Sequence, residues 1–430
     1  MPTLYEWDGS QDGTWQGANN VFSAPPNQTS NDYNYIFGDV TQALRDSAAG
    51  GDDTLTGGAS SYANGLVGDA VEMYDNARGG NDVLIGGAQS EGNDLIGDAA
   101  RLYANSQGGN DVLTGGSGSN SNTLHGDGVV MFDSTQGGND TLAGGDDSAW
   151  NALFADADFM RGNSTGGADV VIGGTSSEYN WLFGDAFWMV DSAQGGNDIL
   201  VAGDNSYQNA LFGDAGELWN DAQGGNDTLV GSDGSELDVM FADGAEMHDN
   251  AKGGNDVLFA GNSAANVLFG DGSAMHDNAR GGDDTLIGGK GNDDLWGDTE
   301  AKYDHAQGGR DTFVFAPHGG NDAIHDFEKG SDLIDFSVLD LYELPPQVPT
   351  DKIPQQALDG LKHSPQTLTG WDVLDSNANG ILDDGDKYVS VVDGNTVIDI
   401  GAAQHLPASV DVVKVLGVTL MTQPDFIFGQ

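Results

Sequence analysis

A repeat of about 29 residues runs through most of this chain and constrains its fold more than any other feature. Each unit opens with a Gly-Gly-x-Asp turn; the first seven intervals between turns are 29 residues, and the last two are 28 and 27. A fixed period of this length is typical of solenoids, in which every unit is one coil stacked on its neighbours. The ten turns begin at Gly50, Gly79, Gly108, Gly137, Gly166, Gly195, Gly224, Gly253, Gly281 and Gly308.

Three short segments recur within each unit. Residues 79–107 read GGNDVLIGGAQSEGNDLIGDAARLYANSQ, where DVLI, NDLIGD and RLYAN are separated by Gly or small polar residues. None is long enough for a helix, so each segment predicts a short strand. We therefore expect an all-β fold, a parallel β-helix or β-roll with three strands per coil. With coils roughly 4.8 Å apart, ten coils make a rod on the order of 50 Å long.

Stacking converts positions of the repeat into columns. Three columns are apolar, one per strand, as a thin three-sided core requires. They run from Leu55 to Phe313, from Ile36 to Leu295 and, rich in Met, from Leu44 to Tyr303. A column of Asn on the second strand predicts amide hydrogen bonds from coil to coil. Its members are Asn34, Asn64, Asn93, Asn122, Asn151, Asn180, Asn209 and Asn266.

An aromatic column follows the second apolar column by one residue. Strand alternation points it away from the core, which favours an exposed stripe for a partner or a carbohydrate. A corner that bends the stripe inward, or a loop that covers it, is the alternative. The column comprises Phe37, Val67, Ile96, His125, Phe154, Phe183, Phe212, Phe241, Phe269 and Trp296.

Three columns of Asp accompany the core. Carboxylates stacked about 4.8 Å apart repel by roughly 3.5 kcal/mol per pair at an effective dielectric near 20, so cations are expected between them. Oxygen ligands in flexible Gly-rich turns suit Ca²⁺ better than Mg²⁺. For the second and third columns, capping of turns by Asp is an equal alternative. The turn column is Asp53, Asp82, Asp111, Asp140, Asp169, Asp198, Asp227, Asp256, Asp284 and Asp311. The second column is Asp39, Asp69, Asp98, Asp127, Asp156, Asp185, Asp214, Asp243, Asp271 and Asp298. The third is Asp46, Asp75, Asp133, Asp191, Asp249, Asp277 and Asp304.

Composition narrows the possible partners. The chain has 14 basic and 68 acidic residues and a net charge of −54, which argues against nucleic acid and anionic membranes as partners. There is no Cys, which excludes disulfides and thiolate metal sites. No apolar run is long enough to predict a transmembrane helix. The first residues do not resemble a Sec-type signal peptide, so an export signal is expected elsewhere.

One segment resembles a known family. Gly288 to Trp296 read GGKGNDDLW and match the nonapeptide GGxGxDxUx of RTX proteins, secreted proteins that bind calcium. The resemblance extends over residues 38–337 and implies a β-roll with Ca²⁺ bound between successive turns. In that family the motif Asp, here Asp293, is a ligand. The 29-residue period departs from the 18-residue family repeat, which leaves the number and geometry of the sites open.

The periodicity ends near residue 315, and we expect a solenoid over 34–315 between an N-terminal cap, 1–33, and a C-terminal cap, 316–430. Residues 319–337 resemble the segment that closes RTX arrays, and a short helix is possible at 355–362. Residues 425–428, Asp-Phe-Ile-Phe, resemble the uncleaved signal of type I secretion. Oxygen ligands at positions 1, 3, 5, 9 and 12, with Gly at 6, predict an EF-hand-like calcium loop at 375–386. The candidate ligands of this region are Asp322, Asp326, Asp332 and Asp335, then Asp375, Asn377, Asn379, Asp383 and Asp386.

No nucleophile motif, phosphate loop or zinc-binding helix is present, so we expect no enzyme activity. The eight His are scattered, and only His248 and His276 share a coil column. This pair is either a transition-metal or base site, or simply a solvated or packed pair of side chains. The sequence favours a secreted calcium-binding structural or interaction protein of the cell surface or matrix, folding on Ca²⁺ outside the cell. A carbohydrate-binding adhesin, self-association and a polysaccharide-modifying β-helix enzyme are the alternatives.

Overall fold

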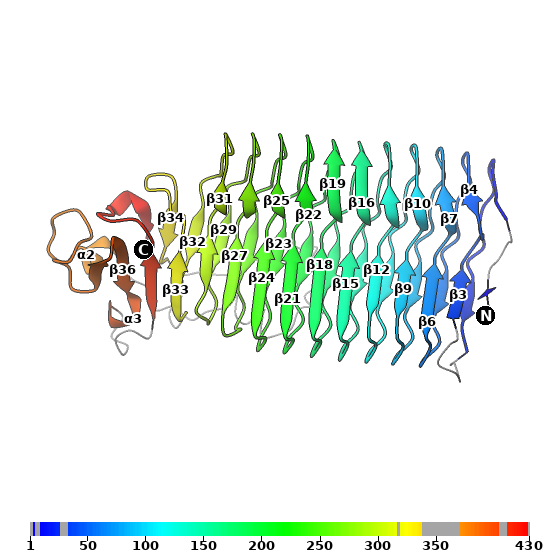
Figure 1. The fold of residues 1–430 in the computed structure, drawn as a ribbon, viewed down its shortest axis with the longest axis horizontal. Coiled ribbons are helices and arrows are strands. Elements are labelled where there is room, and N and C mark those ends of the chain that lie inside the picture. Colours follow the sequence, from blue (N-terminus) through cyan, green and yellow to red (C-terminus); the bar gives the residue numbers. More distant parts are fainter. Residues whose placement is uncertain are drawn as a thin grey trace.

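The computed structural model describes residues 3–4, 9–25, 33–315, 319–337, 370–403 and 411–428. It is an elongated stack of coils with the N-terminus at one end and the C-terminal cap at the other (Figure 1). The helix expected at 355–362 lies outside the described residues.

Each coil contributes one strand to each of three long sheets, so consecutive strands of one sheet lie about one repeat apart in sequence. Sheet I has 13 strands: β2 (Val21–Ser23), β5 (Thr54–Thr56), β8 (Val83–Ile85), β11 (Val112–Thr114), β14 (Thr141–Ala143), β17 (Val170–Ile172), β20 (Ile199–Val201), β23 (Thr228–Val230), β26 (Val257–Phe259), β29 (Thr285–Ile287), β32 (Thr312–Val314), β34 (Leu333–Asp335) and β38 (Phe426–Ile427).

Sheet II has 15 strands: β1 (Thr3–Leu4), β3 (Tyr33–Phe37), β6 (Ala63–Val67), β9 (Asn93–Ile96), β12 (Asn122–His125), β15 (Trp150–Phe154), β18 (Tyr179–Phe183), β21 (Gln208–Phe212), β24 (Leu237–Phe241), β27 (Asn266–Phe269), β30 (Asp294–Trp296), β33 (Asn321–Ile324), β37 (Val412–Val415), β36 (Asn395–Asp399) and β35 (Val389–Val392). Sheet III has ten: β31 (Thr299–Lys302), β28 (Gly272–Met275), β25 (Gly244–Met247), β22 (Ala215–Leu218), β19 (Ala186–Asp191), β16 (Ala157–Gly162), β13 (Gly128–Met131), β10 (Ala99–Leu102), β7 (Ala70–Met73) and β4 (Ala43–Leu44).

All pairings between neighbouring coils are parallel and keep the repeat in register. Leu113, for example, lies opposite Leu84 and Leu142. The predicted fold is confirmed: a parallel β-solenoid of about ten turns with three strands per coil. The predicted Asn column is also a ladder of side-chain amides, in which Asn93 Nδ2 donates to Asn122 Oδ1 at 2.7 Å and the neighbouring rungs repeat the bond.

The interior is divided into two cores, where the sequence predicted a single three-sided one. The first two apolar columns face each other between sheets I and II. The Met-rich column packs separately beneath sheet III, against small residues such as Ala77 and Ala251. At its end the prediction was wrong by one residue: Lys302 lies opposite Met275, whereas Tyr303 is 52% exposed. Two of the three acidic columns lie at the boundary between the cores.

The C-terminal residues continue two of the sheets. Strand β37 pairs in parallel with β33 and carries the antiparallel strands β36 and β35, so sheet II continues past the repeats. Strand β38 extends sheet I beside β34. Short helices α2 (Trp371–Leu374), α3 (Ile400–Ala403) and η1 (Gln423–Asp425) lie between these strands. Together these elements cover the open end of the solenoid, which would otherwise be an exposed sheet edge.

Candidate metal centre

Two of the three acidic columns lie inside the solenoid. The turn column precedes sheet I, and the second column occupies the corner between sheets II and III. Every member of both columns is at most 2% exposed. Charged side chains are almost never buried to this degree unless they are paired or bind metal. We call these two columns the aspartate ladders.

The ladders face each other across tight corners, where most coils have Gly at the position of Gly68 and two have Ala155 or Ala242. A β-carbon on Gly68 would lie 1.9 Å from Oδ2 of Asp82 and 1.7 Å from the carbonyl oxygen of Gly97. A β-carbon on Gly79, in the opposite corner, would lie 1.5 Å from Oδ1 of Asp98 and 2.8 Å from Oδ2 of Asp69. Carboxylate and carbonyl oxygens therefore converge from both sides on the same narrow interior.

Each ladder carboxylate uses part of its hydrogen-bonding capacity to hold the backbone. The amide of Asp82 donates to Oδ1 of Asp111 at 2.6 Å, one coil further on. The amide of Gly109 donates to both oxygens of Asp98 at 3.0 Å. These bonds aim the side chains inward and set the distance between coils.

Most ladder carboxylates still have one buried oxygen that accepts no hydrogen bond within the described part of the chain. In the turn column these are Oδ2 of Asp82, Asp111, Asp140, Asp169, Asp198, Asp227, Asp256, Asp284 and Asp311, and in the second column Oδ1 of Asp69 and Oδ2 of Asp127, Asp185, Asp214, Asp243 and Asp271.

Burial makes the ionised form of these groups unfavourable. Loss of hydration raises the pKa of Asp185 to about 6, of Asp256 to about 7 and of Asp140 to about 8. For Asp98, burial and then the neighbouring carboxylates raise the pKa well above its usual range. At neutral pH the ladders therefore need bound protons or bound cations. Unpaired hard oxygens from two carboxylate columns, with carbonyls beside them, are a ligand set that fits Ca²⁺.

A basic side chain closes the last rung of the second ladder. Lys302 Nζ donates to Asp298 Oδ2 at 2.8 Å and to Glu328 at 2.6 Å. Asp298, predicted as a calcium ligand, is therefore neutralised here by an ammonium group. Asp326 accepts hydrogen bonds from the amides of Asp298 and Thr299 at 2.9 and 3.1 Å, which caps the ladder.

The predicted closing site is divided among different places. Asp332 is the last rung of the turn ladder, because its Oδ1 accepts from the amide of Asp311 at 3.1 Å. Asp322 instead continues the Asn column, accepting from the amide of Asp293 at 3.1 Å. Asp293 itself accepts from Asn266 at 2.8 Å, so the RTX-like motif Asp lies outside both ladders. Asp335, in β34, accepts from the amide of Ser337 at 2.6 Å and joins neither group.

The loop at 375–386 brings all five predicted side chains together. The amides of Asn379 and Gly380 donate to Asp375 at 3.0 and 2.9 Å, and that of Asp383 donates to Asp386 at 3.0 Å. Asn377 and Asn379 both donate side-chain bonds to Asp383, at 3.3 and 2.9 Å. Gly380 has φ of +88°, which the sharp turn of a calcium loop requires. Strand β35, not a helix, follows the loop.

The third acidic column has a different environment. Its members are exposed or half-exposed and have φ between 55° and 64°, at or just after the ends of the sheet III strands. Asp tolerates this left-handed conformation better than most residues. For this column the turn interpretation fits.

The aromatic column on sheet II lies outside both cores but is largely covered. Its rings stack from coil to coil; Phe183 lies 4.9 Å from Phe154 and 4.6 Å from Phe212 between ring centroids. Phe183 is 0% exposed, because Phe187 packs over it from sheet III. The column is therefore not an open stripe, but its cover at Phe183 is a side chain of strand β19 and not the inward bend or the loop of the alternative interpretation.

The comparison with known families agrees with this geometry. A family model described as Peptidase M10 serralysin C terminal matches residues 48–348, more than half of the chain. The chain belongs to this RTX repeat family. The match is to the non-catalytic repeat domain of serralysins, so the solenoid has the fold and family of a calcium-binding repeat protein. Searches of the curated proteins and of the solved structures found no match.

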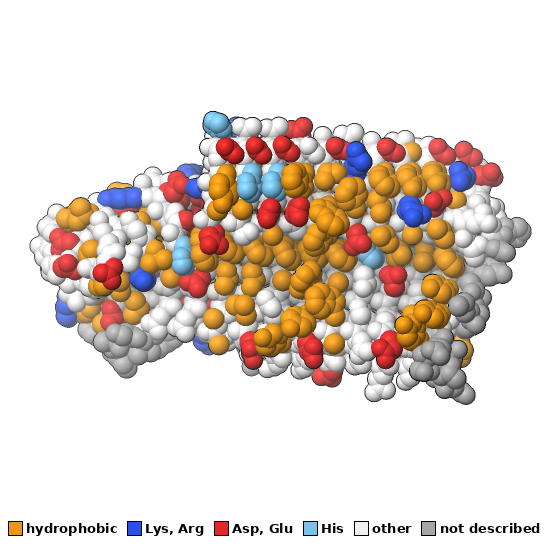
Figure 2. Space-filling model, in the orientation of Figure 1, with side chains coloured by type: hydrophobic (Ala, Val, Ile, Leu, Met, Phe, Trp, Pro, Cys, Tyr) orange, Lys and Arg blue, Asp and Glu red, His pale blue; other side chains and the backbone are white. Residues whose placement is uncertain are grey.

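Sequence reasoning missed a second aromatic row of this RTX solenoid, on the outer face of sheet III. Tyr74, Tyr103 and Phe132 stack at 4.8 and 5.1 Å, and Trp219 starts another stack further along. Figure 2 shows the row of hydrophobic and His side chains over the sheet III strands. Each follows a residue of the Met-rich column, so period-two alternation applied to that strand would have found it.

None of the helices among the described residues has the length and apolar character to span a bilayer.

Proposed function

We propose that this RTX solenoid is a secreted calcium-binding structural or interaction protein that folds when Ca²⁺ enters its aspartate ladders. The observation that carries this proposal is the pair of facing, fully buried carboxylate columns with unpaired oxygens. When the calcium concentration is low, mutual repulsion of the carboxylates opposes folding. At the calcium concentration outside the cell, bound Ca²⁺ ions offset that repulsion by coordinating the carboxylates. The five converging side chains of the loop at 375–386 support one further calcium site.

Export by a type I system is the second part of the proposal. It is supported by the family match and by the Asp-Phe-Ile-Phe sequence at 425–428. In the folded chain Asp425 is 1% and Phe426 7% exposed, with Phe426 in strand β38. Recognition of these residues by an export machine therefore requires a chain that has not yet folded, which agrees with folding on calcium after export.

The first experiment is a calcium titration of the exhaustively chelated protein, followed by far-ultraviolet circular dichroism, with magnesium in parallel. We expect a cooperative gain of β-structure with calcium and little with magnesium, because Mg²⁺ demands a tighter octahedral geometry. Full β-structure in chelator, unchanged by calcium, would contradict folding on metal.

Carbohydrate binding is a second candidate function. The surface that favours it is a groove on sheet III, not the aromatic column on sheet II, which is covered. In the coils of β16 and β19 the outer aromatic row is replaced by Arg161 and Val190, which leaves an open groove of about 560 Å³ beside Trp188 and Trp219. Trp188 is 42% exposed. An indole face binds the C–H face of a sugar ring, and the Arg161–Asp191 ion pair at 2.9 Å offers donors and acceptors for its hydroxyls.

Retention of the calcium-loaded protein on immobilised neutral polysaccharides tests this candidate. Trp188→Ala is expected to abolish retention. Tyr207→Ala removes an aromatic side chain of similar exposure from the turn before strand β21 and serves as the matched control. Equal retention of both variants, or none for the wild type, would exclude the groove.

A further inference from the structure

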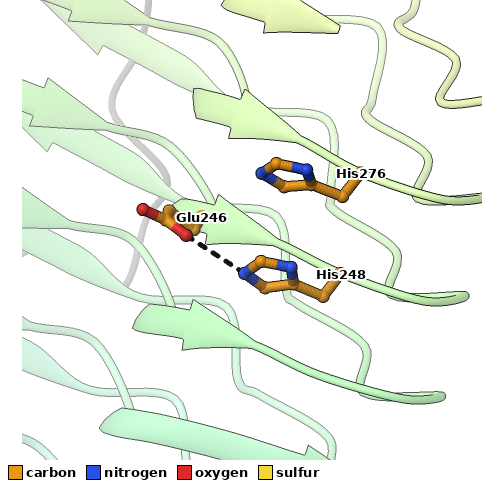
Figure 3. Close-up of side chains that lie close together, drawn as sticks. All are labelled: Glu246, His248 and His276. Carbon is orange, nitrogen blue, oxygen red and sulfur yellow. Dashed lines mark hydrogen bonds and ion pairs between the residues drawn. The ribbon is translucent and has the colours of Figure 1, made fainter. Parts of the chain in front are cut away.

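A cluster of two His and one Glu lies on the outer face of sheet III, away from the aspartate ladders. Glu246 belongs to β25, His248 follows that strand, and His276 follows β28 on the next coil. Figure 3 shows the three side chains on the same face of the sheet, with both rings projecting toward the side of Glu246. Their candidate ligand atoms all lie within 4.8 Å of one another.

Stacking holds the two imidazoles in place. The His248 ring lies 3.7 Å from Trp219 on one side and 4.7 Å from His276 on the other, and the His rings are 6° from parallel. Tyr303 continues the stack 4.7 Å beyond His276. Both His are half-buried, whereas Glu246 is exposed. The stack therefore keeps the two imidazoles next to each other on one face of the sheet.

Glu246 is already directed at the pair. Its Oε2 lies 3.2 Å from Nε2 of His248, the contact drawn in Figure 3. On the preceding coil the equivalent residue is Glu217, which accepts instead from Trp219 Nε1 at 2.8 Å. That bond fixes the indole against His248 and leaves Glu246 as the carboxylate of the cluster.

The chemistry of this ligand set differs from that of the ladders. Two imidazole nitrogens and one carboxylate are a common three-residue set for Zn²⁺, with water in the fourth position. Calcium takes oxygen ligands, so imidazole nitrogens select against it. We propose that Glu246, His248 and His276 form a surface Zn²⁺ site, independent of the calcium ladders. Zinc–nitrogen bonds of about 2.1 Å bring the two ligating nitrogens to about 3.4 Å. Because zinc lies in the plane of each ligating imidazole, the two parallel rings must rotate out of their stack and toward each other when zinc binds.

The site is tested on the full chain in saturating calcium, so that the ladders are filled and the fold is intact. Zinc is titrated by calorimetry, and Co²⁺ absorption reports the coordination geometry. We expect one Zn²⁺ per chain and visible Co²⁺ bands of a tetrahedral N/O site. Co²⁺ is also expected to quench part of the tryptophan emission, and Trp219→Phe should remove that part, because Trp219 contacts His248.

The variants His276→Gln and Glu246→Gln are each expected to weaken zinc binding at least tenfold. His305→Gln is the matched control, an exposed His on the following coil outside the cluster, and should bind zinc like the wild type. Calcium-dependent circular dichroism identical to wild type confirms that each variant is folded. Zinc binding that is unchanged in His276→Gln, or that occurs only with loss of calcium, would overturn the proposal.

Discussion

At the scale of single residues, the same amino acid has opposite roles in columns of one repeat. Asp127 is completely buried and leaves Oδ2 without a hydrogen bond within the described residues, whereas Asp133, six residues later, is an exposed left-handed turn residue with φ of 64°. Burial, not residue type, therefore separates the candidate calcium ligands from residues that shape the turns.

Asp127→Asn is expected to reduce the stabilisation that calcium provides by on the order of 2 kcal/mol, because one charged partner of a buried site is lost. The metal-free form should gain stability, since one source of buried repulsion is removed. Urea unfolding with and without calcium measures both the stabilisation by calcium and the stability of the metal-free form. Asp133→Asn is the control, because Asn also tolerates the left-handed region; an equal effect of both substitutions would contradict the assignment.

At the scale of the element, the coil turn depends on how closely successive coils approach. Gly109 has no room for a side chain, since a β-carbon there would lie 1.4 Å from the carbonyl oxygen of Gly80 on the previous coil. Gly92, at the turn before β9, has nothing within 4 Å of that position. Two glycines of neighbouring coils are thus under different constraints.

Gly109→Ala should destabilise the calcium-loaded protein by more than about 3 kcal/mol, because the backbone of two coils must separate. Gly92→Ala should change stability by no more than about 0.5 kcal/mol. Thermal unfolding in saturating calcium distinguishes them. Similar melting temperatures for the two variants would show that the coils accommodate a side chain at Gly109.

At the scale of the whole molecule, the net charge of −54 is partly internal. The ladders place carboxylates in the centre of the rod, where burial raises the pKa of Asp140 to about 8, and burial with neighbouring charges raises the pKa of Asp311 to about 9. At neutral pH, folding without metal therefore requires these groups to take up protons, whereas calcium binding to the metal-free fold displaces those protons.

The stability of the metal-free fold should consequently be greatest at acid pH. Asp185, Asp140 and Asp311 have folded-state pKa values of about 6, 8 and 9, above the unfolded value near 4, so their contribution to stability is present below pH 4 and is lost as pH rises toward 6–9. Circular dichroism in chelator from pH 3.5 to 9 measures this loss, with sedimentation to exclude aggregation near the pI of about 4.1. Equal β-content across that range would contradict proton uptake by the ladders.

Much of the fold could be predicted because a solenoid repeats one local rule. The period, the three strands per coil, the Asn ladder and the apolar columns all follow from positions that recur along the chain, and Leu113 between Leu84 and Leu142 is typical of them. The candidate ligands on the ladders and in the loop at 375–386 were also named from spacing alone, since stacking turns a recurring Asp into a column.

The tertiary structure decided what spacing does not encode: where each column lies across the coil. The direction of the corners placed two Asp columns face to face between separate cores, put Phe187 over Phe183, and brought Glu246 beside His248 and His276. It also decided the end of the Met-rich column, where the shorter last repeat places Lys302 opposite Met275. A sequence period fixes neighbours along the rod axis, whereas contacts across a coil depend on corner angles, and those arise only when the whole coil closes.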